Sequence, residues 1–220
     1  MGRLTRKETQ AHTRACLMHS AAKVFARRGL QQASIDEVAE DAGFTKGAFY
    51  ANFKSKEELF LAMLDERFTR RIEDIERVIA GEGSTAQKAR RAGDNFVQML
   101  GADREWERLF FEFSAYAARD EDFREELVTR YRAMRDRMAT ALKAHAEDAG
   151  KEATLPFDQV ALMVSVMGNG FALEKLLEGD ALADELYGTM LMVFFAGLDA
   201  LKDAAPAAGT PSTAVGAGPR

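Results

Sequence analysis

Cysteine, long apolar runs and strand-like alternation are scarce or missing in this chain of 220 residues. Its single cysteine, Cys16, excludes an intramolecular disulfide and a cysteine-based metal site, and it fits a reducing cytoplasm. No uninterrupted apolar run approaches the roughly eighteen residues of a membrane-spanning helix, and no signal-peptide-like segment opens the chain. No stretch alternates apolar and polar residues as a strand does. We therefore expect a cytoplasmic, all-α protein with no membrane partner.

Acidic residues outnumber basic ones overall, but the excess is unevenly distributed. The formal net charge is −5, from 30 Lys and Arg against 35 Asp and Glu. Residues 1–56 hold ten basic and five acidic side chains, a balance of +5. Residues 57–220 therefore hold 20 basic and 30 acidic ones, a balance of −10. Because phosphates attract cations, the N-terminal part is the candidate for binding nucleic acid.

Two short helices separated by a tight turn are predicted within residues 33–53, which is the pattern of a helix-turn-helix. Ser34 and Glu37 have the spacing of a capping box, so the first helix begins there. Gly43 stands where a left-handed residue ends a helix, and Thr45 can cap the second helix. In that second helix Phe49 can face the core while polar and small residues point outward. The first helix has one apolar face, formed by Ile35, Val38, Ala39 and Ala42.

Helical periodicity continues through most of the chain, and we expect about nine helices in total. Outside the helix-turn-helix they cover residues 13–28, 55–80, 84–101, 104–118, 121–149, 157–179 and 182–203. The expected domains are a helix-turn-helix domain (1–56), a connecting helix (57–80), a ligand-binding and dimerisation domain (81–204) and a disordered tail (205–220). The first domain opens with a basic arm, which is either solvated or reaches an adjacent DNA groove: Arg3, Arg6 and Lys7.

Residues 44–59 (FTKGAFYANFKSKEEL) resemble the N-terminal signature of the TetR family of bacterial transcriptional regulators, as do residues 21–30 and 34–39. The resemblance is specific because it combines turn glycines, helix caps, a tyrosine and a lysine at fixed offsets. One departure is Asn52, where family members often carry histidine. The resemblance implies an all-helical homodimer with an N-terminal DNA-binding domain and a variable C-terminal domain that binds a small molecule.

Eight residues are candidates for contacts with a double-stranded DNA operator. A helix N-terminus attracts phosphate, so the caps Ser34 and Thr45 can hold the DNA backbone, although a cap is also purely structural. Lys56 opens a helix, where a cation opposes the helix dipole, and this placement suggests a phosphate partner. The resemblance places Tyr50 at a position that hydrogen-bonds phosphate; a core aromatic is the alternative. Candidates for base edges or close approach to the groove are Lys46, Gly47, Ala48 and Asn52.

The C-terminal part carries aromatic and methionine side chains that suit an adaptable apolar cavity. Plain core packing is the alternative for each of them. We expect a hydrophobic, largely uncharged small molecule as the effector, and no cofactor. The candidates for the pocket lining are Trp106, Phe110, Phe113, Met134, Met138, Met163, Met167 and Phe171.

The last two expected helices are apolar on more than one face, which a monomer cannot cover. Small residues such as Gly168 and Gly197 would allow close helix approach. Pairing with the same helices of a second copy would give a four-helix homodimer interface with twofold symmetry. The candidates for this interface are Val160, Val164, Leu186, Met190, Val193, Phe194, Gly197 and Leu201.

An enzyme and a DNA-binding module without an effector are the alternatives. The histidines His12, His19 and His145 share no metal-ligand spacing, and Glu112 and Glu174 stand alone among many acidic residues. The long, aromatic-rich C-terminal part argues against a module without a ligand. We therefore predict a repressor that a small molecule releases from its operator. Recognition helices of such a dimer must lie roughly 34–36 Å apart, and the helix of residues 55–80 would change that separation.

Overall fold

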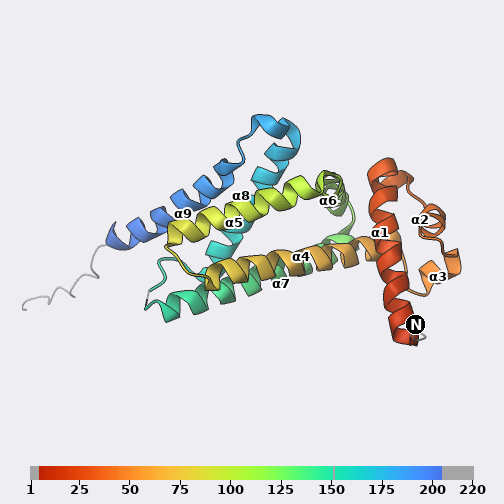
Figure 1. Ribbon diagram of the computed structural model, residues 1–220, viewed down its shortest axis with the longest axis horizontal. Helices are drawn as coiled ribbons and strands as arrows, with labels where there is room; N and C mark the ends of the chain where they lie inside the picture. Colours follow the sequence, from red (N-terminus) through yellow and green to blue (C-terminus); the bar gives the residue numbers. More distant parts are fainter. Residues whose placement is uncertain (1–4, 151, 205–220) are drawn as a thin grey trace, which may run out of the picture.

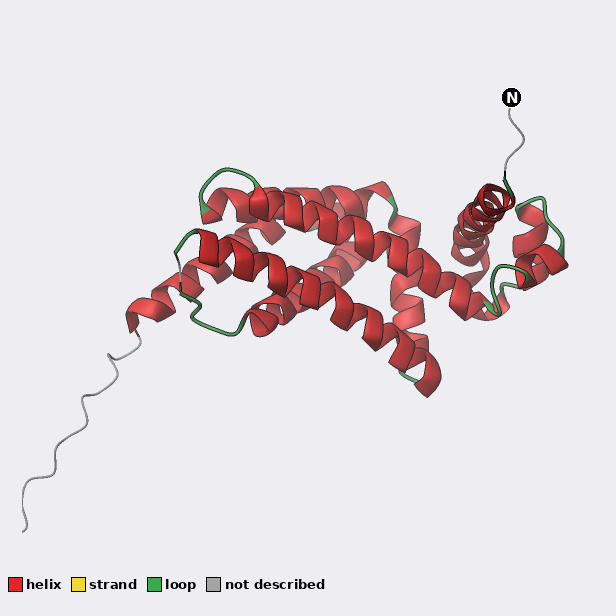
Figure 2. Cartoon of the chain, turned by 90° about the horizontal axis from the view of Figure 1, so that it is seen from below, coloured by secondary structure: helices red, strands yellow, loops and turns green. Residues whose placement is uncertain are grey.

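Helices α1 to α3 form one end of the molecule, and α4 leads from them into a longer helical bundle (Figure 1). The computed structural model describes residues 5–150 and 152–204, and within them the chain is all-α, with no strand (Figure 2). The helices are α1 (Arg6–Gln32), α2 (Ile35–Asp41), α3 (Lys46–Tyr50), α4 (Lys56–Ala80), α5 (Thr85–Ala102), α6 (Arg104–Ala117), α7 (Glu121–Asp148), α8 (Phe157–Glu178) and α9 (Glu185–Ala204), with a 3-10 turn, η1 (Gly179–Ala181), before α9.

Helix α1 begins earlier than the sequence pattern predicts. Thr5 and Glu8 form a capping box, so the helix begins at Arg6 and not near residue 13. Arg6 and the following lysine are therefore part of its first turn, which corrects their assignment to a loose arm. Arg3 and the expected tail of residues 205–220 lie outside the described residues. Gly29, at φ +72°, interrupts α1 before its last turn, as a residue without a Cβ readily can.

The helix-turn-helix forms as predicted because its caps and its turn are in place. Ser34 and Glu37 form a capping box at the start of α2, and the Thr45 hydroxyl accepts the backbone N–H of Ala48 at the start of α3. Gly43 adopts φ +74° between the two helices. Helix α3 is too short to be stable alone, so its stability comes from packing against α1 and α2. The side chains that bury it have 2% exposure or less: Leu17, Phe25, Val38, Phe49 and Phe53.

Helix α6 connects the core of this N-terminal unit with the bundle. Its Phe113 ring stacks on Phe60 of α4 with centroids 3.5 Å apart, and meets Phe25 of α1 edge-on at 5.8 Å. Trp106 stacks on Phe60 at 5.5 Å. One apolar core therefore spans α1, α4 and α6.

Helices α5 and α9 pack backbone against backbone. A Cβ atom on Gly93 of α5 would lie only 2.4 Å from the Cα atom of Gly188 of α9, which is far inside van der Waals contact. The two helices also run side by side in Figure 1. This close approach requires glycine at Gly93, since any side chain would force the helices apart.

Candidate DNA-binding surface and ligand cavity

The outward face of α3 is formed by residues that the sequence assigns to DNA contacts. Phe49 is fully buried, and this fixes the rotation of the helix. Lys46 and Gly47 are exposed as a result, Ala48 is half-buried, and Tyr50 keeps 51% of its surface exposed. The Lys46 ammonium lies 2.9 Å from an Asp36 carboxylate oxygen, and this hydrogen bond raises the pKa of the lysine. Lys46 is thus a fixed cation on an accessible surface.

Asn52 is held at the end of α3 by contacts within the protein. Its side-chain N–H donates to the carbonyl of Ala48 at 2.8 Å, while its own backbone carbonyl accepts the Arg14 guanidinium at 3.0 Å. Its side-chain oxygen is buried and has no hydrogen-bond partner among the residues that the structure describes. In this position the amide completes the end of the helix and is not presented outward, so a base contact would require the side chain to turn.

Lys56 has a structural role that the sequence argument did not foresee. Its ammonium donates to the carbonyls of Leu30, at 2.6 Å, and Ala33, at 3.3 Å, at the end of α1. A cation stabilises the free carbonyls of a helix C-terminus. This contact accounts for a lysine at the start of α4 without any phosphate, which removes the reason for predicting one there.

Glu112 of α6 contacts the same segment of α1. Its carboxylate accepts the backbone N–H of Leu30 at 2.5 Å, immediately after the interruption at Gly29. The two residues are 82 positions apart, and the sequence showed Glu112 only as one acid among many. A carboxylate from the C-terminal part and the Lys56 ammonium therefore both hydrogen-bond the backbone at the end of α1.

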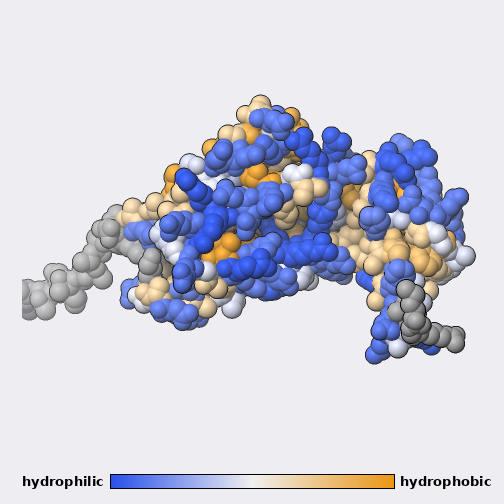
Figure 3. Space-filling view, in the orientation of Figure 1, coloured by the Kyte–Doolittle hydropathy of each residue, from blue (hydrophilic) through white to orange (hydrophobic). Residues whose placement is uncertain are grey.

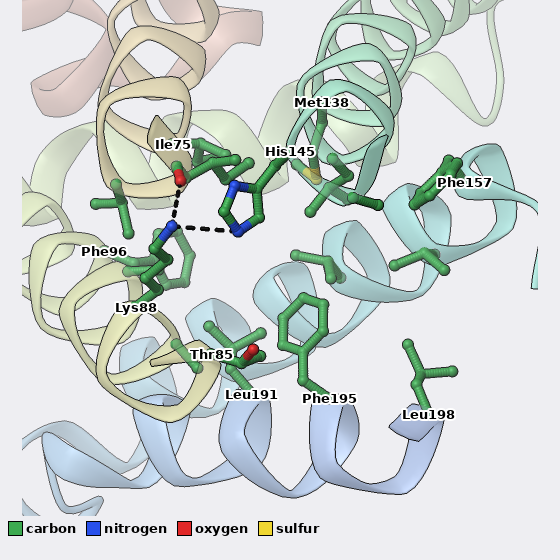
Figure 4. A pocket seen from close by; sticks show the side chains of 18 of the residues that line it. Ile75, Thr85, Lys88, Phe96, Met138, His145, Phe157, Leu191, Phe195 and Leu198 are labelled. Atoms are coloured by element: carbon green, nitrogen blue, oxygen red, sulfur yellow. Dashed lines mark hydrogen bonds between the residues drawn. The ribbon is translucent and has the colours of Figure 1, made fainter. Parts of the chain in front are cut away.

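A cavity of about 220 Å³ lies in the bundle between α4, α5, α7, α8 and α9. Figure 4 shows Met138 from α7, Leu191 and Phe195 from α9 and Phe96 from α5 among the side chains around it. Its volume is far above that of one water molecule and its lining is mostly apolar, as in sites for small organic ligands. The further apolar residues that line it include Ile75, Val78, Ile79, Ala89, Ala92, Leu142, Val160, Val164 and Leu198.

Polar groups stand at separate points around this cavity. The Lys88 ammonium donates to the backbone carbonyl of Ile79 at 2.6 Å and lies 3.2 Å from His145 Nε2 (Figure 4). Arg71 lines the cavity at the end where it meets Phe96, and Tyr187 lies beside it. The cavity can therefore hold an apolar body and still offer hydrogen bonds.

Most of the predicted pocket residues lie elsewhere, and only Met138 lines the main cavity. Trp106 and Phe110 line a second cavity of about 30 Å³, room for about one water molecule. The prediction was wrong for the others, because the rotation of each helix turns them into solid core or toward solvent. Phe113, Met134 and Phe171 are core residues, Met167 packs against the core cluster of α5 and α9, and Met163 is 43% exposed.

Two family models match the chain, one for each part. Residues 17–63 match the bacterial regulatory proteins of the TetR family. Residues 84–200, more than half of the 220, match the C-terminal domain of BetI-type transcriptional repressors. The chain belongs to the TetR family. TetR-family proteins are DNA-binding regulators and not enzymes, so this protein is a transcriptional regulator.

Curated TetR-family relatives resemble only part of the chain. The transcriptional activator FasR of Mycolicibacterium smegmatis is 33% identical over 99 residues, which is 45% of either chain. The regulator TtgR of Pseudomonas putida is 42% identical over 65 residues, 30% of either chain. The chain thus matches less than half the length of these relatives.

Solved structures share the complete TetR-family fold at low identity. FadR from Bacillus subtilis, in complex with stearoyl-CoA, superposes with a TM-score of 0.67 at 15% identity, over 82% of this chain and 96% of that one. Salmonella enterica GusR gives 0.71 at 20% identity, over 90% and 98%. These likenesses establish the fold.

The outer faces of α8 and α9 leave apolar side chains exposed in this TetR-family protein, and Figure 3 shows apolar residues at the edge that these helices form. On α9 the predicted residues Leu186, Val193 and Leu201 are 40 to 68% exposed. On α8 the predicted face was wrong, because Val160 and Val164 line the cavity. Of the other predicted residues, Met190 and Phe194 are half-buried and Gly197 is exposed. The exposed apolar residues of α8 are Leu162, Met163, Val166, Leu173 and Leu177.

Helix α8 is the one described helix that is long and apolar enough, by length and composition, to cross a membrane. The segment is Phe157–Ala181, and 33% of its most apolar window is buried. The core helix of a soluble protein passes the same test. Because Ala161, Ser165 and Phe171 of this helix are packed inside the bundle, we interpret it as a core helix with one apolar outer face.

Proposed function

We propose that this regulator is a cytoplasmic, homodimeric repressor that leaves its double-stranded operator when an apolar small molecule occupies the main cavity. The observation that carries the proposal is the position of α4. This one helix begins at Lys56, beside the helix-turn-helix, and lines the cavity with Arg71, Ile75 and Val78 in its second half. The match of residues 84–200 to a repressor domain supports repression as the outcome of DNA binding.

The exposed face of α3 is the part of the surface that we expect in the major groove. Lys46 and Gly47 are exposed there, and the caps Ser34 and Thr45 place helix N-termini on the same unit. A helix N-terminus and a lysine suit phosphates and guanine acceptors respectively. Tyr50, exposed on α3, is the candidate for a further phosphate contact.

The exposed apolar faces of α8 and α9 are the surface that we expect between the two copies. Val166 and Leu177 on α8 are 61 and 72% exposed, and Val193 on α9 is 68% exposed. Contiguous exposed apolar surface of this kind marks an interaction site. Two such helices from each of the two copies give a four-helix interface with twofold symmetry.

Occupation of the cavity acts on the operator complex through α4. A ligand larger than the present space displaces the cavity lining, and α4 carries that displacement to its start at Lys56, which holds the end of α1. The spacing of the two recognition helices then departs from the roughly 34–36 Å that successive major grooves require. Because coupling is reciprocal, the operator must weaken ligand binding by the same factor.

The experiment begins with selection of bound sequences from random DNA duplexes. The selected site is then titrated with the protein in the presence of a panel of apolar fatty acids, fatty alcohols and aromatic compounds. We expect at least one class to lower operator affinity. The variant Ala92→Trp, which fills the cavity from α5, should bind the same duplex with an affinity that no longer depends on the compound.

Two results would contradict the proposal. One is a protein whose operator affinity no compound of the panel changes, although compounds bind; the other is an Ala92→Trp variant that responds as the wild type does. The sign of regulation is read from a reporter gene behind the selected site. Removal of the protein raises its transcription if the protein is a repressor.

A further inference from the structure

The main cavity and the small cavity are neighbours, and the same side chains separate them. Three residues line both of them: Arg71, Phe96 and Met99. The Arg71 guanidinium lies over the Phe96 ring, 4.4 Å from its centroid. The partition is therefore a charged group over an aromatic ring, at what we call the inner end of the main cavity.

The donor groups of this inner end converge beside Gly168 of α8. A Cβ atom on Gly168 would lie 2.7 Å from Arg71 Nη2 and 3.0 Å from the Tyr187 hydroxyl oxygen. The missing side chain thus leaves room for a guanidinium and a phenol side by side. Tyr187 is only 2% exposed, and its hydroxyl donates to the Val164 backbone carbonyl across a long 3.4 Å. Because burial raises the pKa of Tyr187, the hydroxyl keeps its proton and can donate to a carboxylate in place of that carbonyl.

Arg71 has no carboxylate partner within ion-pair distance in the described part of the chain, whereas its neighbour Arg67 forms an ion pair with Asp103. The charge of Arg71 acts on Glu107, which lines the small cavity and is 8% exposed. Burial raises the pKa of Glu107 to about 7, although the charges of Arg71 and Arg67 act against this shift. Near neutral pH this carboxyl is therefore only partly charged. Arg71 is half-buried, and a cation that is partly removed from water without a full counter-charge is costly; an incoming anion removes that cost.

We propose that the effector is an amphiphile with a single carboxylate, which enters head first and places the carboxylate between the Arg71 guanidinium and the Tyr187 hydroxyl. The apolar body then lies along Ile75, Leu191 and Phe195. This inference rests on the proposed function, in which the main cavity is the effector site. It revises the expectation of a largely uncharged ligand.

The test compares octanoate with 1-octanol, which differ at the head group and share the chain. Binding of both to the full-length protein is measured by titration calorimetry at neutral pH. If the Arg71 guanidinium binds the carboxylate, octanoate should bind at least tenfold more tightly than octanol. Arg71→Met should abolish this preference, and Arg71→Lys, which keeps the charge but not the planar fork, should keep part of it.

Arg70→Met is the matched control. Arg70 is the preceding residue of α4 and pairs with Glu66 on the exposed surface, so the same loss of charge occurs outside both cavities. Its octanoate preference should equal that of the wild type. Operator affinity in the absence of octanoate reports whether each variant is folded.

A second measurement needs no variant. The carboxyl carbon of ¹³C-labelled octanoate is followed by NMR through a pH titration, free and bound. A carboxylate beside a guanidinium stays ionised to lower pH, so the bound pKa should fall below the free one.

Several outcomes would overturn the inference: octanoate that does not bind, equal affinities for octanoate and octanol, an unshifted carboxyl pKa, or a preference that is lost in Lys88→Met and kept in Arg71→Met. If octanol releases the operator as well as octanoate does, the inference fails while the proposed function stands. If no compound of the wider panel affects the operator, the proposed function itself fails.

Discussion

The helix-turn-helix unit and the bundle are built from the same kind of amphipathic helix, yet one is solid and the other hollow. In the first, Leu17, Phe49 and Leu59 have no exposed surface. In the second, a cavity of about 220 Å³ lies against Met138 and Phe195. A unit that must present a fixed face to DNA gains from dense packing, whereas a unit that must respond to a ligand needs space and lower local stability.

The largest expected effect on stability comes from making the same Phe→Ala substitution in each of the two regions. Phe49→Ala should lower the free energy of unfolding by about 3–5 kcal/mol, because it empties a closed core. Phe195→Ala should cost only about 1–2 kcal/mol, because the half-buried ring already borders a cavity. Denaturant unfolding followed by circular dichroism measures both. Equal losses would mean that the bundle is packed as tightly as the N-terminal unit.

Glu107 provides the next largest effect, and its sign depends on pH. Its pKa is raised from 4.5 to about 7 in the folded protein, so the wild type loses stability as the pH rises from about 4.5 through 7. Glu107→Gln lacks this loss and should be more stable above pH 7, by at most about 3 kcal/mol, with little difference below pH 4.5.

Unfolding free energies of both proteins between pH 4 and 9 test this prediction. The charged groups around Glu107 are Arg67, Arg71 and Asp103, and their effects are included in the shift. A variant that is less stable than the wild type at pH 8 would show that the ionised carboxylate is stabilised by the two arginines.

A smaller effect on stability is expected where α5 and α9 of the bundle pack without space between them. Gly93→Ala should cost about 1–3 kcal/mol, because the new Cβ atom would lie 2.4 Å from the Cα atom of Gly188. Gly101→Ala, on the same helix with no atom within 4 Å of the new Cβ, is the control and should not destabilise. Thermal unfolding of the two variants distinguishes a close helix contact from a general effect of alanine.

Lys46→Ala is expected to have the smallest effect on stability and the largest effect on DNA binding. Its ion pair with Asp36 is exposed, so Lys46→Ala should leave the unfolding curve unchanged. Affinity for the selected operator should fall roughly ten- to a hundredfold if the side chain reads a base. A uniform loss on all duplexes, with a smaller salt dependence, would assign it to phosphate instead.

The sequence predicts the N-terminal unit well because its determinants are close together along the chain. Ser34, Glu37, Gly43 and Thr45 set helix ends and a turn by contacts within a few residues. Side-chain caps set the beginnings of α4 to α7 in the same way, whereas α8 has no such cap and α9 begins three residues later than predicted. The beginning of α1 was missed because the cap at Thr5 precedes a polar segment with no apolar stripe.

Pocket and interface residues depend on how helices rotate against partners that are distant in the sequence. Met138 faces the cavity while Met134, one turn earlier on α7, is buried in core, and no periodicity distinguishes them. On α8, Val160 and Val164 face inward and Val166 outward, a choice made by packing on α7 and α9. Arg71 and Glu112 were missed because a charged residue within a helix normally indicates a solvent-exposed face.

The glycine contact between α5 and α9 determines which side of the cavity can yield. With no side chains between them at Gly93 and Gly188, these two helices have no compressible layer, so they resist displacement as one body. In the proposed function, a bound ligand would therefore displace the opposite side of the cavity, where α4 contributes Ile75 and Val78. The displacement that we propose is thus directed onto α4, the helix that begins at Lys56 beside the helix-turn-helix.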